Sequence, residues 1–124
     1  MTKEQQKIKS LYKKLLASPL HSFPLPGKPL DSTTEHGVYI IYNRRKVVVH
    51  VGRTLRARNG LKQRLRNHLQ GNSSFSNMYL NGDGSKLRKG YKYKYLIIKN
   101  PRHRALVEAL AIGQLCPKHI GLGD

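Results

Sequence analysis

The residues best suited to chemistry lie in two short triplets and on the segment that follows them. The triplets Gly37-Val38-Tyr39 and His50-Val51-Gly52 each carry one polar ring among small and apolar residues. Arg64 and His68 are four residues apart, so a helix would place both side chains on one face. Imidazole transfers protons near neutral pH, and a guanidinium forms two parallel hydrogen bonds to an oxyanion. These residue types indicate a candidate site.

A β-hairpin and a helix must position these side chains. The run Gly37–Tyr42 is apolar, β-branched and aromatic, which favours a buried strand. A polar break over residues 43–46 has hairpin length, and a second β-branched run, Lys46–Val51, ends at Gly52. After a basic loop, leucines recur every four residues and give one apolar helical stripe, formed by Leu61, Leu65 and Leu69.

In order and spacing, these elements resemble the GIY-YIG nuclease module over about Gly37 to Pro117. The resemblance implies that the two triplets lie on adjacent strands and that Arg64 lies on the next helix. The first triplet differs from the family pattern by Val for Ile. The second has His50 where the family usually has Tyr, and Val for Ile.

The resemblance also implies catalytic roles. Tyr39 would take the proton from the attacking water, and Arg64 would stabilise the charge that develops on the phosphate. His50 keeps a polar group in place of the second Tyr, and His68 would support the phosphate or the water. A phenol with its ordinary pKa of about 10 is a poor base at neutral pH, so nearby cations such as Arg64 and a metal would have to lower it.

Glu108 is the only charged residue in the apolar run 105–112. A carboxylate there must be paired or bind a metal, because an isolated buried charge is costly. A salt bridge to an arginine is the ordinary explanation. The resemblance implies instead that Glu108 holds one divalent metal ion, and Mg²⁺, with Mn²⁺ as a substitute, takes one or two protein carboxylates in such sites.

The C-terminal segment departs from the family pattern. The family commonly has an Asn after a Pro near the end of the module. Here Pro117 is followed by Lys118-His119-Ile120, and Ile120 stands at the expected place. Either His119 substitutes for the Asn or that element is missing.

The charge of the chain favours a polyanionic partner. It has 24 Lys and Arg against 6 Asp and Glu, for a net charge of +18. Basic side chains placed at phosphates release condensed counterions, so we expect binding to nucleic acid. Charge alone does not separate DNA from RNA, and it is the resemblance that implies double-stranded DNA. The residues expected to contact its backbone are Arg53, Arg56, Arg58, Lys62, Arg66, Lys86, Arg88 and Lys89.

Cysteine content and hydropathy indicate the compartment. A single cysteine, Cys116, excludes an intrachain disulfide and fits a reducing environment. No apolar run approaches the roughly 20 residues of a membrane span, and no secretory signal follows Met1. The sequence therefore predicts an intracellular, cytoplasmic protein that does not enter a membrane.

Residues 1–36 are predicted to form an N-terminal helix and a Pro-rich connector, and residues 37–124 the nuclease-like domain. The helix, over residues 3–17, has capping-box spacing at Thr2 and Gln5. Tyr91–Lys99 alternates as a third strand, and Asn100-Pro101 opens a last, buried helix that Pro117 ends. We expect an α+β fold: a small, three-stranded, mainly antiparallel sheet flanked by helices, with an extra N-terminal helix.

The leading hypothesis is a metal-dependent endonuclease of the GIY-YIG type that hydrolyses DNA phosphodiester bonds with one divalent metal. The first alternative is a DNA- or RNA-binding module of the same fold with impaired catalysis, and the second is a basic structural protein of a ribonucleoprotein. A chain of this length has room for little beyond the module, so target specificity would come from loops, a homodimer or a partner protein.

Overall fold

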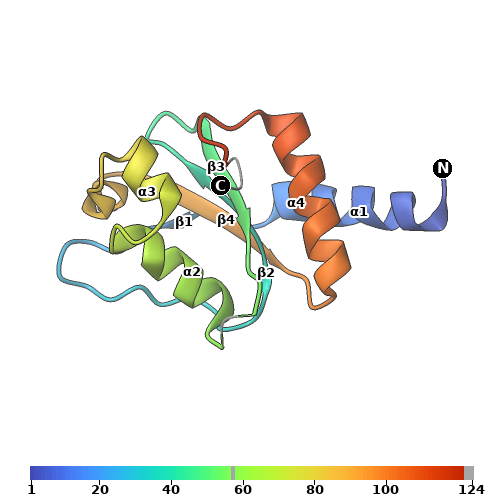
Figure 1. The fold of residues 1–124 in the computed structure, drawn as a ribbon, viewed down its shortest axis with the longest axis horizontal. Helices are drawn as coiled ribbons and strands as arrows, with labels where there is room; N and C mark the ends of the chain where they lie inside the picture. The colour runs from blue at the N-terminus through green and yellow to red at the C-terminus, as the bar shows by residue number, and fades with distance from the viewer. Residues whose placement is uncertain (57, 122–124) are drawn as a thin grey trace.

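The computed structural model describes residues 1–56 and 58–121, with one antiparallel sheet between two layers of helices (Figure 1). The strand order is β1-β4-β2-β3, from β1 (His21–Ser22), β4 (Lys92–Ile97), β2 (Gly37–Tyr42) and β3 (Val48–Arg53). One face is covered by α2 (Gly60–Leu69), α3 (Ser74–Tyr79) and the 3-10 helix η1 (Gly84–Arg88), the other by α1 (Lys3–Ala17) and α4 (Pro101–Leu115).

The predicted α+β class, antiparallel sheet and N-terminal helix are confirmed. The three expected strands are joined by a fourth, β1, because the connector pairs its residues His21 and Ser22 with β4. This strand lies at the edge of the sheet and is only two residues long, which is too short for a periodic pattern in the sequence to predict it.

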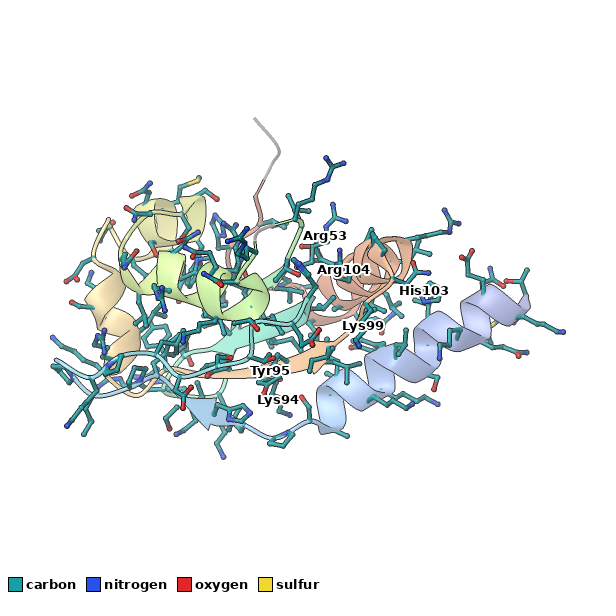
Figure 2. The ribbon with its side chains drawn as sticks, turned by 90° about the horizontal axis from the view of Figure 1, so that it is seen from below. Arg53, Lys94, Tyr95, Lys99, His103 and Arg104 are labelled. Atoms are coloured by element: carbon teal, nitrogen blue, oxygen red, sulfur yellow. The ribbon has the colours of Figure 1, made fainter. Side chains whose placement is uncertain are left out.

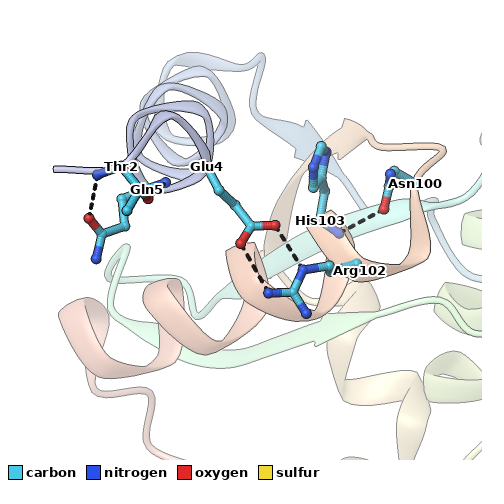
Figure 3. Close-up of polar contacts among 6 residues, drawn as sticks. All are labelled: Thr2, Glu4, Gln5, Asn100, Arg102 and His103. Atoms are coloured by element: carbon cyan, nitrogen blue, oxygen red, sulfur yellow. Dashed lines mark hydrogen bonds and ion pairs between the residues drawn. The ribbon is translucent and has the colours of Figure 1, made fainter.

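Capping residues fix the start of both helices on the α1–α4 side (Figure 3). The Thr2 side chain accepts from the Gln5 amide at 3.0 Å, and the Gln5 side chain accepts from the Thr2 amide at 2.8 Å. This reciprocal pair is the capping box that the sequence predicts. Asn100 accepts from the amide of His103 at 3.1 Å and opens α4.

Helix α4 lies on the surface, so the prediction of a buried helix is wrong. Only Arg104, Val107 and Ala111 are buried, because the helix covers one face of the sheet and α1 packs on part of its flank. The Glu4 carboxylate joins the two helices through bonds of 2.8 and 3.0 Å to Arg102 (Figure 3). Among the described residues, no helix has the length and apolar character of a membrane span.

The N-terminus of α2 docks on the connector. The amides of Leu61 and Lys62 donate to the carbonyls of Glu35 and Thr33 at 2.9 and 2.8 Å. These are first-turn N–H groups, which have no partner within the helix itself. Gly60 begins the helix with φ +47° against the Thr34 and Glu35 carbonyls, where a Cβ would clash. The connector therefore fixes the position of α2 and of every side chain on it.

Arg104 ties the loop after β3 to the start of α4 (Figure 2). Its Nη1 donates to the carbonyls of Ile98 and Lys99, both at 3.0 Å, and its Nη2 donates to the Leu55 carbonyl at 3.2 Å. The side chain is buried, so these bonds satisfy a cation that would otherwise be costly inside the protein.

The sheet register brings Tyr39 across the neighbouring strand. Tyr39 pairs directly with Gly52 of β3, and its ring and hydroxyl occupy the space that a side chain at Gly52 would fill. Tyr39 is fully buried, so its position depends on the absence of a Cβ at that residue.

We predict that Gly52→Ala destabilises the fold by about 1–3 kcal/mol, because the added methyl group overpacks against the buried phenol. Urea unfolding followed by circular dichroism measures this change. Gly113→Ala is the matched control: it lies in α4 with no atom within 4 Å of the new Cβ, and should stabilise by about 0.5–1 kcal/mol. Equal effects of the two substitutions would contradict the packing argument.

Candidate active site

A cavity of about 380 Å³ opens where the end of β3 meets α2 and α4. Three residues singled out from the sequence line it, namely Arg53, Arg64 and Glu108. The sequence did not indicate the other lining residues, which are Thr54, Leu55, Gly60, Gln63 and Asn67. Gln63 and Asn67 flank Arg64 on the same helix and are bonded to each other at 2.8 Å, so helical spacing could have suggested them.

Glu108 and Arg53 form an ion pair at the edge of the cavity. Arg53 Nε lies 3.3 Å from Glu108 Oε1, and both side chains are about a quarter to a third exposed, at 32% for Arg53 and 23% for Glu108. Burial raises the pKa of the Glu108 carboxyl, while the positive charges of Arg53 and Arg64 act in the opposite direction. The sequence indicated that Glu108 could form a salt bridge with an arginine, without identifying which one. The structure has this salt bridge, and the arginine is Arg53 at the end of β3 (Figure 2).

Tyr39 and His68 form a buried pair that does not line the cavity. The Tyr39 hydroxyl lies 2.6 Å from His68 Nε2, and neither residue is exposed. Burial raises the pKa of Tyr39 to about 12, and it outweighs the opposing charge and hydrogen bond of Arg64. The expected lowering of this pKa by Arg64 is thus present but insufficient in the protein alone, and Tyr39 is a neutral phenol.

Two serines complete the surroundings of His68. His68 Nδ1 lies 2.6 Å from Ser73 Oγ, and Ser76 Oγ donates to the His68 carbonyl at 2.5 Å. Ser73 is also the N-cap residue of α3, and its hydroxyl accepts from the Ser76 amide at 3.2 Å. The residue type of Ser73 could have suggested a helix cap. The contact between Ser73 and His68 could not be predicted in this way, because it depends on the turn that follows α2.

His50 lies in the same buried layer as Tyr39 and His68. Its ring stacks on Phe75 at 4.7 Å between centroids and meets His68 edge-on at 5.1 Å. His50 Nδ1 is 3.3 Å from Nδ1 of His119. Within residues 1–56 and 58–121, the Nε2 atoms of His50 and His119 have no hydrogen-bond partner.

His119 reaches this layer because the segment after α4 runs along the free edge of β3. The His119 amide donates to the Val49 carbonyl at 2.9 Å, and the His119 ring is buried against Phe75. Ile120, which stands at the place of the family's Asn, is 47% exposed. His119 is therefore the residue of this segment that contacts the candidate site.

The three imidazoles are neutral near pH 7. Burial lowers the pKa of His50 to about 3, helped by the charges of His119 and Arg64. Burial likewise lowers the pKa of His68 well below its usual value, and the pKa of His119 in the same direction. These neutral rings can therefore donate and accept hydrogen bonds within the buried layer. The charged side chains Arg53, Arg64 and Glu108 line the cavity instead.

The other basic residues singled out from the sequence do not line the cavity. Arg56 and Arg58 are exposed in the loop beside it, and Lys62 and Arg66 are partly exposed on α2. Lys86 and Lys89 lie on and after η1. Arg88 is engaged in the fold, since its Nη1 donates at 3.1, 3.0 and 2.8 Å to the connector carbonyls of residues 24, 25 and 28.

The cavity suits a hard cation held by few protein ligands. Glu108 is the one carboxylate among its lining residues, which also include Gln63 and Asn67 with their side-chain amides. Across the described part of the chain, no group of three or more His, Cys, Asp or Glu could hold a metal ion. This donor set fits Mg²⁺, which keeps several waters and takes one or two carboxylates, and it does not fit an all-protein cage.

The neutral histidine layer predicts loss of stability in acid. An unfolded imidazole binds a proton below its pKa of about 6.5, whereas folded His50 stays neutral down to a pKa of about 3. The unfolded state binds more protons between these values, so the free energy of unfolding should fall by a few kcal/mol, on the order of 1–4, as pH falls from 7 to 4. His68, His119 and Arg64 face His50 and oppose its protonation.

Urea unfolding at several pH values measures this slope. His50→Phe, which keeps a ring to stack on Phe75, should make it shallower. Ile41→Val, a buried change without a titrating group, should lower stability at every pH and leave the slope as it is. An unchanged slope in His50→Phe would show that other groups cause the acid loss.

We compared the chain with known protein families, curated proteins and solved structures. No protein-family model matches the chain, and no curated protein matches it either. Among solved structures, it is similar to the GIY-YIG N-terminal endonuclease domain of UvrC from Thermotoga maritima bound to its catalytic divalent cation, magnesium. The TM-score is 0.51 and the identity 23%, over 98% of this chain and 100% of that chain.

Mutant structures of the same domain give a similar result. An asparagine-to-alanine mutant and a tyrosine-to-phenylalanine mutant, each bound to its catalytic divalent cation, both have a TM-score of 0.51 and 23% identity. They cover 98% of this chain and 99% and 100% of theirs. The chain therefore has the fold of the GIY-YIG endonuclease domains, as the two triplets and Arg64 predict.

Proposed function

We propose that the protein is a metal-dependent endonuclease that hydrolyses phosphodiester bonds in DNA. The observation that carries the proposal is the convergence of Arg64 and Glu108 on one cavity. The positive charge of Arg64 also acts on the buried Tyr39, where it opposes the rise in pKa that burial causes. A phosphate in this cavity would meet the Arg64 cation and a carboxylate that can hold a metal, and the phenol of Tyr39, which can exchange protons, lies buried outside the cavity lining. These are the parts that hydrolysis of a phosphodiester requires.

Each residue has a distinct role in the proposed reaction. The Arg64 guanidinium stabilises the charge that develops on the phosphate oxygens, because its planar fork matches their geometry. Tyr39 receives the proton of the attacking water. His50, to which we assign an assisting role in this proton transfer, lies beside His68 in the buried layer and does not line the cavity.

Glu108 would hold the metal ion, with water and phosphate oxygens as the remaining ligands. When bound, Mg²⁺ supplies Lewis-acid stabilisation of the phosphate and of the leaving oxygen. Arg53, which pairs with Glu108 at 3.3 Å, is also placed to contact a phosphate in the cavity that both residues line.

Exposed cations around the cavity would bind the nucleic-acid backbone. Arg56 and Arg58 lie in the loop that borders it, and Lys62 and Arg66 lie on α2 beside it. We extend the same role to Lys86 and Lys89. Arg88 already donates hydrogen bonds to three carbonyls of the connector. Of these basic residues, it is therefore the one least available to bind nucleic acid.

A binding module without catalysis is the second candidate. It is favoured by the Arg53–Glu108 pair, which satisfies the carboxylate without a metal, and by the exposed Ile120 at the place of the family's Asn. Cleavage of supercoiled plasmid and of RNA, side by side with Mg²⁺ or EDTA, separates the two. Metal-dependent nicking of the plasmid supports the endonuclease, and salt-dependent binding without cutting supports the module.

Glu108→Gln should abolish plasmid cleavage, with a loss of at least about 10³-fold, while DNA affinity changes little, because metal binding needs the charged carboxylate. Cleavage assays and fluorescence anisotropy measure the two effects. Glu4→Gln is the matched control, since Glu4 also pairs with an arginine but lies on α1. Cleavage by Glu108→Gln at the unaltered rate would refute the metal-site assignment.

Arg64 and Arg66 should differ in what their removal changes, although both lie on α2. Arg64→Ala should lower the single-turnover rate at saturating DNA by about 10²–10³-fold, because it removes a donor aimed at the reacting phosphate. Arg66→Ala should leave that rate unchanged, weaken binding and reduce the salt slope by about 1. The reverse pattern would move the reacting phosphate away from Arg64.

A further inference from the structure

The hydroxyls of Ser73 and Ser76 form a closed hydrogen-bonded chain with His68 and Tyr39. The Tyr39 hydroxyl lies 2.6 Å from His68 Nε2, and His68 Nδ1 lies 2.6 Å from Ser73 Oγ. Ser73 Oγ is 3.2 Å from Ser76 Oγ, which lies 2.5 Å from the His68 carbonyl oxygen. All four residues are at least nine-tenths buried, so water does not compete for these bonds.

The direction of each bond follows from the one group that cannot donate. The His68 carbonyl only accepts, so the Ser76 hydroxyl must donate to it. The Ser76 oxygen is then free to accept the hydrogen of Ser73. Ser73 Oγ, having given its hydrogen to Ser76, accepts from the Ser76 amide and from His68 Nδ1–H.

The opposite polarity leaves a buried hydrogen without an acceptor. If Ser73 donated to His68 Nδ1, Nε2–H would have to donate to the Tyr39 oxygen. The Tyr39 hydrogen would then have no acceptor among the described residues, inside a fully buried site. An unsatisfied buried donor costs about 1–3 kcal/mol, which favours the first arrangement.

We propose that Ser73 is a positioning residue for the reaction: it holds His68 in the Nδ1–H tautomer, so that Nε2 accepts the proton of Tyr39. The proposal rests on the proposed nuclease function and assigns a role that neither the triplets nor the resemblance gives to Ser73. Ser73 acts through His68 and does not touch the cavity.

The proton step balances along this chain. As the attacking water loses a proton, its O–H bond breaks and a new O–H bond forms on Tyr39. The original Tyr39 O–H bond breaks and its proton joins the Nε2 lone pair of His68. The water oxygen keeps the electron pair that forms the new P–O bond, while the P–O bond to the leaving oxygen breaks and that oxygen takes its electron pair. His68 becomes an imidazolium whose Nδ1–H still donates to Ser73. Tyr39 is never left as an anion, which fits a phenol whose burial raises its pKa to about 12.

Two substitutions separate this role from the cap of α3. Ser73→Gly removes the hydroxyl, and glycine at an N-cap costs only a few tenths of a kcal/mol. Ser73→Asp keeps a capping group and an oxygen that accepts from Nδ1–H but cannot donate when ionised. Ser74→Gly is the matched control, since it alters the exposed neighbouring residue in the same turn.

The first readout is the tautomer of His68 in the full-length, ¹⁵N-labelled chain, from long-range proton–nitrogen NMR at neutral pH. We expect Nδ1–H in the wild type, Ser74→Gly and Ser73→Asp, and a shift towards Nε2–H in Ser73→Gly. Nε2–H in the wild type, or Nδ1–H unchanged in Ser73→Gly, would overturn the proposal.

The second readout is single-turnover DNA cleavage with Mg²⁺ across pH. Ser73→Gly should lose about 10²-fold, the lower end of general acid–base effects, and Ser73→Asp should recover most of the rate with an altered pH profile. Equal losses in both variants would reduce Ser73 to a structural cap and overturn the proposal. A wild-type chain that cuts nothing would refute the nuclease function, whereas the NMR tautomer decides the hydrogen-bond polarity independently.

Discussion

The antiparallel register that sets Tyr39 opposite Gly52 is the constraint on which the site depends. Because Gly52 has no Cβ, the phenol crosses β3 and its hydroxyl reaches His68 on α2. A slip of one residue would turn every side chain of β2 to the other face of the sheet. Tyr39 would then lie among the aliphatic side chains that pack Val38 and Ile40 against α1 and α4, with no partner for its hydroxyl.

The two faces of the sheet consequently have different cores. The α1–α4 side buries aliphatic groups, whereas the α2–α3 side buries a connected set of polar rings and hydroxyls. Such groups are costly inside a protein unless their hydrogen bonds are made, and the chain from Tyr39 to Ser76 makes its own internally. Among the described residues, the Nε2 atoms of His50 and His119 lack such a partner. In the resting protein the imidazoles of this layer are uncharged, because burial near Arg64 disfavours an imidazolium. The fixed charges lie at the cavity, on Arg53, Arg64 and Glu108.

Capping patterns and residue spacing in the sequence predicted the helices and strands, but they did not predict contacts between segments that are distant in the sequence. Capping residues located the starts of α1 and α4, and four-residue spacing located Arg64 and His68 on α2. The sequence indicated that Glu108 could pair with an arginine, but it could not identify Arg53 as the partner, since that depends on how the end of β3 meets α4. The raised pKa of Tyr39 and the contact of Ser73 with His68 depend on burial and on the turn after α2, which no periodicity encodes.

The few acidic residues explain why the surface stays so basic. Within residues 1–56 and 58–121, only Glu4 and Glu108 form ion pairs, and Asp83 caps η1. Most of the 24 Lys and Arg residues are therefore uncompensated, including every lysine on the exposed side of α1. Self-repulsion of this kind weakens the free protein, and a polyanion that binds the native state relieves it. The proposed nucleic-acid ligand would account both for the excess of Lys and Arg and for the position of Arg64 and Glu108 in one cavity.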